Sequence, residues 1–446
     1  MKFKSFNQAE QYLESFIPEY GKWGELVFAH DRTKHFMKLL GDPQNKLKVI
    51  HIAGTSGKGS TAYMTSALLH SQKMKVGMGI SPHIHTLLER IQINTHPISE
   101  ELFCTYLSEI SPHIEAMKNS EYTGITYFEI IVGLTYYIFF KENVDVAVME
   151  VGLGGRYDAT NTVSSPHKMS VITRIGYDHM EFLGTTLEEI AGVKAGIIQK
   201  ENVVIKLLQE PEVMSIFEKE ATAQDARLIT LNAHTVISSK KVTLSGLEFS
   251  YTYDGLTFEN LRLPLVSDYQ FENGALALAA FGEFMKREKR TIDSASVRSG
   301  LAHISIPGRM EIRRYKDKEV ILDGAHNGQK MEAFIQSLVR LYPDQTFSFL
   351  ISIKKGKQYE SMLKPLIQYA EHIIVTSFEN ANQGMGNIHS EEPEVIAKHL
   401  DSLGFTNYTV IPDLSKALHT GVSQNERLII TGSLYLIGEV FQLLEK

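Results

Sequence analysis

The sequence predicts an α/β protein: a P-loop domain with a doubly wound, mainly parallel sheet and an added small β element, followed by a second, Rossmann-like α/β domain. Three observations carry this prediction. A buried strand runs into a glycine-rich turn and a helix, further strand-like runs alternate with helical segments, and Pro307-Gly308 separates two such series. The length of 446 residues suits two or three domains better than one core.

The first series of strand-like runs belongs to the P-loop domain. Short apolar runs rich in β-branched residues are typical of buried strands. Such runs stand at residues 48–53, 144–151, 169–175 and 202–207. Because helical segments separate several of them, the strands are expected to lie parallel in a doubly wound sheet.

Two helices of this domain have clear signals in the sequence. The apolar stretch 125–140 is short for a lipid bilayer and carries Glu129, so we predict a buried helix. Thr186 and Glu189 have the spacing of a capping box, which predicts a helix start. Lys194 would then lie about two turns into that helix.

The alternation of strands and helices changes after the first series. Residues 228–265 contain short β-prone runs and turn residues, which favour an antiparallel hairpin decorating the first domain. Helical stretches at about 272–288 and 293–301 then lead to the break at 306–308, where proline and glycine interrupt regular structure. We place the domain boundary just before this break.

The predicted division gives a P-loop ATP-binding domain at 1–300 and a C-terminal α/β domain at 301–446. The second domain shows its own alternation of strands with helices, such as the helix predicted at 328–341. Its strands are expected near residues 319–323, 346–353, 371–377, 407–411 and 427–431.

Composition narrows the class of protein. The formal net charge of −7 argues against a broad nucleic-acid-binding face. Cys104 is the single cysteine, so no intramolecular disulfide and no cysteine-based zinc site can form, which fits a reducing cytoplasm. The start, MKFKSFNQAEQYLESF, lacks the apolar core of a signal peptide. We therefore expect a cytoplasmic protein without membrane or nucleic-acid partners.

The strongest local signal is the glycine-rich stretch AGTSGKGST at residues 53–61. It follows a strand and precedes an apolar helix, so backbone amides and Lys58 can surround nucleotide phosphates while Ser60 or Thr61 reaches magnesium. The stretch departs from GxxxxGK[ST], because Gly59 separates Lys58 from Ser60. A structural glycine turn with an incidental lysine is the alternative, but the order of strand, loop and helix favours nucleotide binding.

Further motifs extend the pattern over nearly the whole chain. In order they are GTSGKGST, SPHIHTLLERIQIN, EVGLGGRYDATN, IGYDHMEFLGTTLEEIAGVKAGII, PGRME, DGAHN and TGSLYLIGEV. Through them the sequence resembles the folylpolyglutamate synthase and dihydrofolate synthase family of the Mur-type ligases. This resemblance implies a P-loop domain, a C-terminal domain that closes over it and a substrate cleft between the two.

The resemblance also implies the residues of an ATP site. Arg309 comes from PGRME and Asp323 from DGAHN, so both belong to the second domain. The implied ATP contacts are Gly57, Lys58, Gly59, Ser60, Asn273, Arg309 and Asp323.

Ser81, Glu150 and His179 match family positions that hold Mg²⁺. Two magnesium ions are expected, and a monovalent cation is a further expectation. Hard oxygen ligands suit magnesium, so His179 is chemically the least expected of the three. A solvated acid at a strand end is the alternative for Glu150, and a capping or core histidine is the alternative for His179.

Lys194 matches a family lysine that can be carbamylated. That change would turn a cationic amine into an anionic oxygen ligand able to support a second metal ion. An exposed helix lysine is the alternative, since Val193 stands where the family usually has Glu.

Two stretches match the family site for the pterin-bearing substrate. Core packing of the aromatic side chains and turn chemistry for Asp158 are the alternatives. The implied residues are Thr126, Tyr127, Phe128, Glu129, Tyr157, Asp158 and Ala159.

The implied reaction joins L-glutamate to a folate-type carboxylate at the expense of ATP. The carboxylate attacks the γ-phosphate to give an acyl phosphate, and the free amine of glutamate then displaces phosphate. Lys58, Lys194 and His326 are the catalytic candidates, although a hydrogen bond at the domain interface explains His326 equally well. The expected partners are ATP, L-glutamate and a reduced folate or dihydropteroate, and the family suggests a monomer.

The sequence departs from the family pattern at two further places. Gly328 replaces the usual proline after DGAHN, and ISIKKGKQY at 351–359 lacks an acidic DKD-like element. Three other functions remain open at this point: a Mur-type ligase acting on a UDP-linked cell-wall precursor, a P-loop kinase or NTPase, and a non-enzymatic nucleotide- or folate-binding protein.

Overall fold

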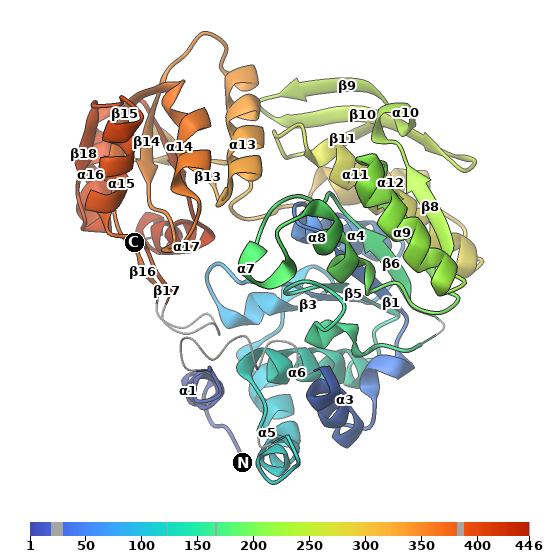
Figure 1. Ribbon diagram of the computed structural model, residues 1–446. Helices are drawn as coiled ribbons and strands as arrows, with labels where there is room; N and C mark the ends of the chain where they lie inside the picture. Colours follow the sequence, from blue (N-terminus) through green and yellow to red (C-terminus); the bar gives the residue numbers. More distant parts are fainter. Residues whose placement is uncertain (19–29, 123, 166, 381–387, 446) are drawn as a thin grey trace.

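The computed structural model describes residues 1–18, 30–122, 124–165, 167–380 and 388–445. Two separate sheets organise the chain (Figure 1). The larger sheet has eight strands in the order β4-β3-β2-β5-β1-β6-β7-β8, and the second has six in the order β12-β13-β19-β14-β15-β18. We call the part around the larger sheet the P-loop domain and the part around the second sheet the C-terminal domain.

The larger sheet confirms the predicted doubly wound, mainly parallel architecture. Its strands are β1 (Val49–Ala53), β2 (Val76–Gly79), β3 (Ile91–Ile93), β4 (His96–Pro97), β5 (Val146–Glu150), β6 (Met169–Ile172), β7 (Val203–Leu207) and β8 (Arg227–Leu231). Strands β2, β5, β1, β6, β7 and β8 run parallel, whereas β3 and β4 form an antiparallel edge that the sequence did not predict. This edge was missed because its strands hold only three and two residues.

Helices cover both faces of this sheet. They include α1 (Phe6–Glu14), α3 (His30–Leu39), α4 (Lys58–Ser71), α5 (Glu100–Lys118), α6 (Tyr127–Lys141), α7 (Met180–Leu183), α8 (Leu187–Ala195), α9 (Pro211–Ala223), α10 (Ala233–Val236), α11 (Gln270–Arg287) and α12 (Ser294–Ala302). Short 3-10 helices are η1 (Pro43–Lys46), η2 (Leu87–Arg90) and η3 (Ala159–Thr162). The predicted buried helix is α6, and the capping box of Thr186 and Glu189 starts α8.

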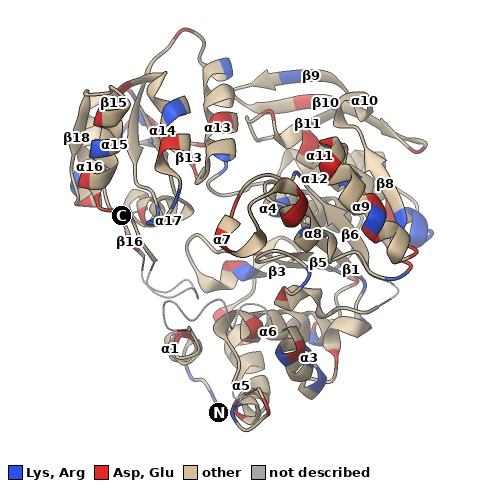
Figure 2. Cartoon of the chain, viewed as in Figure 1, with Lys and Arg blue, Asp and Glu red and all other residues tan. Residues whose placement is uncertain are grey.

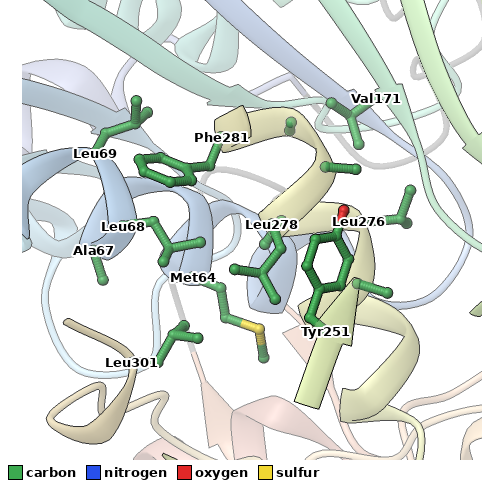
Figure 3. Close-up of a cluster of buried hydrophobic side chains, with 14 of the residues drawn as sticks. Met64, Ala67, Leu68, Leu69, Val171, Tyr251, Leu276, Leu278, Phe281 and Leu301 are labelled. Atoms are coloured by element: carbon green, nitrogen blue, oxygen red, sulfur yellow. The ribbon is translucent and has the colours of Figure 1, made fainter. Parts of the chain in front are cut away.

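The predicted β element is a three-stranded antiparallel sheet of β9 (Ile237–Thr243), β10 (Gly246–Tyr253) and β11 (Leu256–Leu263). The predicted span 228–265 was too wide at its start, because β8 pairs in parallel with β7 and belongs to the main sheet. Figure 3 shows Tyr251 of this element in one apolar cluster with Met64 of α4 and with Leu276, Leu278 and Phe281 of α11. This shared core fixes α11 beside α4, which begins at the glycine-rich loop.

The C-terminal domain has the predicted α/β character. Its elements are β12 (Glu311–Tyr315), β13 (Lys318–Asp323), α13 (Gly328–Leu341), β14 (Phe347–Ile351), α14 (Tyr359–Ile367), β15 (Ala370–Val375), β16 (Glu379–Asn380), β17 (Ile388–His389), α15 (Pro393–Ser402), β18 (Tyr408–Val410), α16 (Leu414–Gln424), β19 (Arg427–Thr431) and α17 (Leu434–Leu444). All five predicted strands are present, and β12 is an additional antiparallel edge strand. The boundary at residue 300 stays a prediction, and α12 runs across it.

Two further features of the fold are the distribution of its charged residues and the hydropathy of its helices. Acidic and basic residues are interspersed over the elements seen in Figure 2. In the described ranges, no helix is long and apolar enough to cross a membrane.

The register of the parallel strands brings three loops to one edge of the main sheet. Ile52 of β1 lies opposite Glu150 of β5, and Ala53 of β1 lies opposite Ile172 of β6. The carboxyl ends of these strands therefore coincide, and the loops that follow them meet. In open α/β sheets this edge, where the strand order reverses, is where ligands bind.

Candidate active site

The glycine-rich loop joins β1 to α4 through a backbone that requires glycine. Gly57 has φ +91° and caps the helix that begins at Lys58. A Cβ atom at Gly57 would lie 2.2 Å from Oδ1 of Asn273, so a side chain there is excluded by both backbone and space. The free amides at this helix start form the kind of site that binds phosphate.

The loop after β6 holds the glycine-rich loop in place. Thr55 N–H donates to the carbonyl of Arg174 at 2.9 Å. The Thr55 hydroxyl donates to the carbonyl of Gly176 at 3.0 Å and accepts from the Gly176 amide at 3.1 Å. These reciprocal bonds tie residues 174–176 to the phosphate loop.

The start of α11 also lines the glycine-rich loop. The Asn273 amide donates to Gln270 Oε1 at 2.8 Å, and the Gln270 amide donates to Ser60 Oγ at 3.3 Å. The structure thus brings together three of the predicted ATP contacts, Gly57, Ser60 and Asn273. Among the described residues, the buried hydroxyls of Ser56 and Thr61 have no hydrogen-bond partner, so this loop holds unused polar groups.

Glu150 ends β5 directly beside the phosphate loop. Its side chain is buried and accepts a hydrogen bond from the Ser81 amide at 3.1 Å. A Cβ atom at Gly59 would lie 3.5 Å from Glu150 Oε2. Burial raises the pKa of Glu150, while the positive charges of Lys58 and Arg309 oppose this shift. A buried carboxylate next to a phosphate loop and a serine is a donor set suited to magnesium, not a solvated acid at a strand end.

His179 is the N-cap residue directly before α7, with φ +51°. Burial is the largest cause that lowers its pKa to about 3, so the ring is neutral and can offer a nitrogen lone pair. Lys58 acts electrostatically on both His179 and Glu150, which indicates that all three face one region. Across the described residues, no group of three or more His, Cys, Asp or Glu side chains forms a metal cluster; the candidate set here includes a serine.

Lys194 lies on α8 and is buried, unlike the exposed helix lysine that was its alternative. Its Nζ donates to the carbonyl of Gly54 in the phosphate loop at 2.9 Å. Burial and then the charge of Lys58 lower the pKa of Lys194 to about 7. The neutral form of the Lys194 amine is therefore substantially populated near neutral pH.

The C-terminal domain contributes Asp323 at the end of β13. Its carboxylate accepts from the amides of Met310 and Ala325, each at 2.8 Å. Burial raises the pKa of Asp323 to about 6, and the charge of Arg309 opposes the rise. The positive charge of Arg309 also acts on Glu150, so Arg309 lies near the end of β5 in the P-loop domain.

His326 follows Asp323 and precedes α13. Its Nδ1 lies 2.8 Å from the carbonyl oxygen of Gly324, which can only accept, so Nδ1 carries the proton. Nε2 lies 2.8 Å from Nζ of Lys330. Burial and the neighbouring charge of Lys330 lower the pKa of His326 well below its usual value, which keeps the imidazole neutral.

Asp178 joins the two domains and was missed by sequence reasoning. Its buried carboxylate accepts from the Asn327 amide at 3.0 Å, from Lys330 at 3.2 Å and from Lys357 at 3.1 Å. All three donors belong to the C-terminal domain. The one available signal was the position of Asp178 directly before His179 in IGYDH, and Lys357 lies in the stretch that lacks the acidic element.

The predicted pterin-binding residues fall into two groups. At the start of α6, Glu129 accepts from the guanidinium of Arg32, from Thr33 Oγ1 at 2.8 Å and from Thr126 Oγ1 at 2.7 Å. Glu129 is therefore the centre of a buried polar network that holds α3 against α6. Tyr127 is buried, with the guanidinium of Arg90 5.8 Å from its ring centre.

The second group follows β5. Asp158 caps η3 and accepts from the amides of Leu153 at 2.8 Å and Thr160 at 3.0 Å, which matches the turn chemistry given as its alternative. Tyr157 is 47% exposed, and Ala159 is buried. Phe128 connects the two groups, because a Cβ atom at Gly152 would lie 2.3 Å from its ring.

Comparison with known protein families covers both domains. The family described as Mur ligase middle domain matches residues 52–281. The family described as dihydrofolate synthetase, C-terminal domain, matches residues 309–443.

Individual relatives match over almost the whole chain. The dihydrofolate synthase/folylpolyglutamate synthase of Bacillus subtilis is 34% identical over 412 residues, 92% of this chain and 93% of that protein. The dihydrofolate synthetase of Saccharomyces cerevisiae is 32% identical over 427 residues, 92% of this chain and 96% of that protein.

Solved structures agree with this fold. The folylpolyglutamate synthase of Mycobacterium tuberculosis complexed with ADP superposes with a TM-score of 0.88 at 27% identity, covering 99% of this chain and 98% of that one. FolC of E. coli in complex with DHPP and ADP gives 0.81 at 26% identity, covering 99% and 98%. The chain belongs to the folylpolyglutamate synthase and dihydrofolate synthase family of ATP-dependent ligases, within the Mur-type ligases.

Proposed function

We propose that this protein joins L-glutamate to the carboxylate of a folate-type substrate, with ATP cleaved to ADP and phosphate. The observation that carries the proposal is the convergence of a phosphate loop on one domain with Arg309 and Asp323 on the other. Relatives bound to ADP have the same overall fold. A UDP-linked cell-wall precursor is not favoured as the substrate, because relatives matching over nine-tenths of the chain are folate enzymes.

ATP is expected to bind with its phosphates at the start of α4. Gly57, Gly59 and Ser60 would supply backbone amides, and Lys58 would supply a positive charge. Asn273 lines the same loop. Arg309 and Asp323 would complete the nucleotide site from the C-terminal domain.

Magnesium fits the residues beside this loop. Ser81, Glu150 and His179 would hold the ion, since they offer a hydroxyl, a buried carboxylate and a neutral imidazole. When bound, it supplies positive charge that offsets the charge of the phosphates. A carbamate on Lys194 would keep an N–H that can donate to Gly54, while its new oxygens would serve a second ion. A monovalent cation is a further proposal.

The first step is transfer of the γ-phosphoryl group. A carboxylate oxygen of the folate-type substrate forms a bond to the γ-phosphorus while the bond from phosphorus to ADP breaks. Lys58 and Arg309 stabilise the charge that develops on the transferring oxygens. Closure of the domains through Asp178 keeps water from the acyl phosphate.

The second step forms the amide. The amine of glutamate attacks the acyl carbon, and the tetrahedral intermediate collapses with loss of phosphate. The neutral imidazole of His326 lies at the domain interface, where it can orient this substrate or the intermediate.

The pterin part of the substrate is assigned to the residues that follow β5 and begin α6. Tyr157 offers an exposed aromatic ring there. The other residues assigned to this part of the site are Thr126, Tyr127, Phe128, Asp158 and Ala159. Glu129 would act indirectly by holding α6 in place, because its carboxylate oxygens already accept hydrogen bonds from Arg32 and Thr33.

We favour extension of reduced folates, with dihydropteroate ligation as the second candidate. The match to the dihydrofolate synthetase C-terminal family and the likeness to a structure containing DHPP support the second reaction. We further propose that the protein acts as a monomer in the cytoplasm.

The test measures glutamate-dependent ADP release with ATP and magnesium, offering tetrahydrofolate and dihydropteroate separately. Product mass reports one added glutamyl unit. Mass gain with tetrahydrofolate supports polyglutamylation, and gain with dihydropteroate supports the biosynthetic step. ADP release without any glutamyl product from either acceptor would contradict the proposal.

A further inference from the structure

Lys330 lies on the first turn of α13 and has no role in the reaction as described so far. It points across the domain interface, with Nζ 3.2 Å from Asp178 Oδ2 and 2.8 Å from His326 Nε2. Its side chain is 22% exposed, so it is largely shielded from solvent but still accessible. Lys330 therefore stands where a reacting group could reach it.

The hydrogen bonds around Lys330 leave room for one more proton. His326 gives its Nδ1 proton to Gly324, so Nε2 accepts. Asp178 accepts as well. A neutral lysine amine has two N–H groups and one lone pair, so these two acceptors use both hydrogens and leave the lone pair free.

The surroundings of Lys330 make its amine easier to deprotonate than that of an ordinary lysine. Burial is the largest cause that lowers the pKa of Lys330 to about 8, and the positive charges of Lys58 and Arg309 add to it, whereas Asp178 opposes the shift. Lys357 takes the other oxygen of Asp178, which weakens this opposition. A base that titrates near the working pH is suited to proton transfer.

We propose that Lys330 is the general base of amide formation, and that His326 and Asp178 orient its amine. This inference rests on the proposed function. The Lys330 lone pair takes a proton from the glutamate ammonium, and the freed nitrogen pair forms the C–N bond. The carbon–oxygen bond to phosphate then breaks, and phosphate carries away the second nitrogen proton. The ammonium of Lys330 keeps Asp178 as its counter-ion.

The test compares two nucleophiles in Lys330→Ala and Lys330→Arg. Hydroxylamine is uncharged at neutral pH, so it attacks an acyl phosphate without a base, whereas glutamate must first lose a proton. We expect both variants to form the glutamyl product about 100- to 1,000-fold more slowly. Hydroxamate formation should stay within about 3-fold of the parent, because it needs no general base.

The arginine variant and a matched control distinguish two possible roles of Lys330, a general base and a purely structural contact. Arginine keeps the positive charge beside Asp178 but cannot give up its proton at the working pH. Lys398 is an exposed lysine on α15, and its replacement by alanine should leave both activities unchanged. In the parent, kcat/KM for glutamate should rise with pH to a plateau above about 8, whereas in Lys330→Ala it should keep rising with the deprotonation of the glutamate amine itself.

Three outcomes would overturn the inference. These are an equal loss of glutamyl product and hydroxamate, recovery of glutamate use by Lys330→Arg, or an unchanged pH limb in Lys330→Ala. Failure of the proposed function looks different, since the parent protein itself would then give no glutamyl product.

Discussion

The two halves of the site are built in different ways. The phosphate half comes from backbone geometry within residues 53–61, together with a loop that follows the neighbouring strand. The interface half comes from side chains far apart in sequence, since Asp178 and Lys357 are separated by 179 positions. The first half is a local property of the chain, and the second exists only when the two domains dock.

Lys58→Ala should produce the largest loss in the phosphate half. It removes the positive charge at the start of α4 that faces the transferring phosphoryl group. We expect glutamate-dependent ADP release to fall about 1,000-fold, in the range measured for lost transition-state contacts. A variant within about 5-fold of the parent would show that this half does not carry the charge stabilisation.

Gly57→Ala tests whether the loop backbone itself matters. A residue other than glycine at φ +91° costs about 1–3 kcal/mol, and the added Cβ also meets Asn273. ATP should bind about 10- to 100-fold more weakly, as measured by titration calorimetry. Asn273→Ala in the same background would relieve the contact but leave the backbone strain and also remove a proposed ATP contact, so ATP affinity should not return to that of the parent.

Asp178→Asn tests the interface half alone. The substitution removes the counter-charge of Lys330 and Lys357 while keeping the shape of the side chain. Product formation should fall about 30-fold, but ATP affinity should stay within about 3-fold, because breaking one partner of a charged cluster costs a few kcal/mol. Equal losses of product formation and of ATP affinity would show that the interface half and the phosphate half do not act separately.

The pH dependence of nucleotide binding gives the smallest effect. The raised pKa of Asp323, about 6, means that the folded protein binds this proton more tightly than the unfolded chain. Protonation therefore favours the folded state as pH falls through about 6, yet it removes the charge from the ATP site. We expect ATP affinity to drop about 5-fold between about pH 7 and pH 5. In Asp323→Asn this drop in ATP affinity should be absent. The variant therefore separates the titration of Asp323 from the titration of the nucleotide.

The comparison also explains what the sequence could predict. Strands, helix starts and the phosphate loop follow from local patterns, and the strands at 48–53, 144–151, 169–175 and 202–207 are present. The short edge strands β3, β4 and β12 were missed because runs of two to five residues carry little periodicity. The assignment of β8 to the hairpin was wrong because only pairing with β7 reveals its sheet.

Within the site, local contacts were predictable and distant ones were not. Gly57, Lys58 and Ser60 follow from the loop motif, whereas Asn273 was expected only from the family resemblance, and the structure places its side chain beside Gly57. No local sequence pattern shows that the carboxylate of Asp178 accepts a hydrogen bond from Lys330. Likewise, the buried ion pair of Arg32 with Glu129 joins residues that are 97 positions apart. Such pairs depend on how the helices pack.

The reciprocal hydrogen bonds between Thr55 and Gly176 have a consequence for the motions of this protein. Gly176 lies two residues before Asp178, so the phosphate loop and the docking point of the C-terminal domain share one short backbone segment. Local opening of this segment would release both contacts together. In amide hydrogen exchange, residues 55–57 and 174–178 should therefore behave as one cooperative unit, and nucleotide should slow their exchange in parallel.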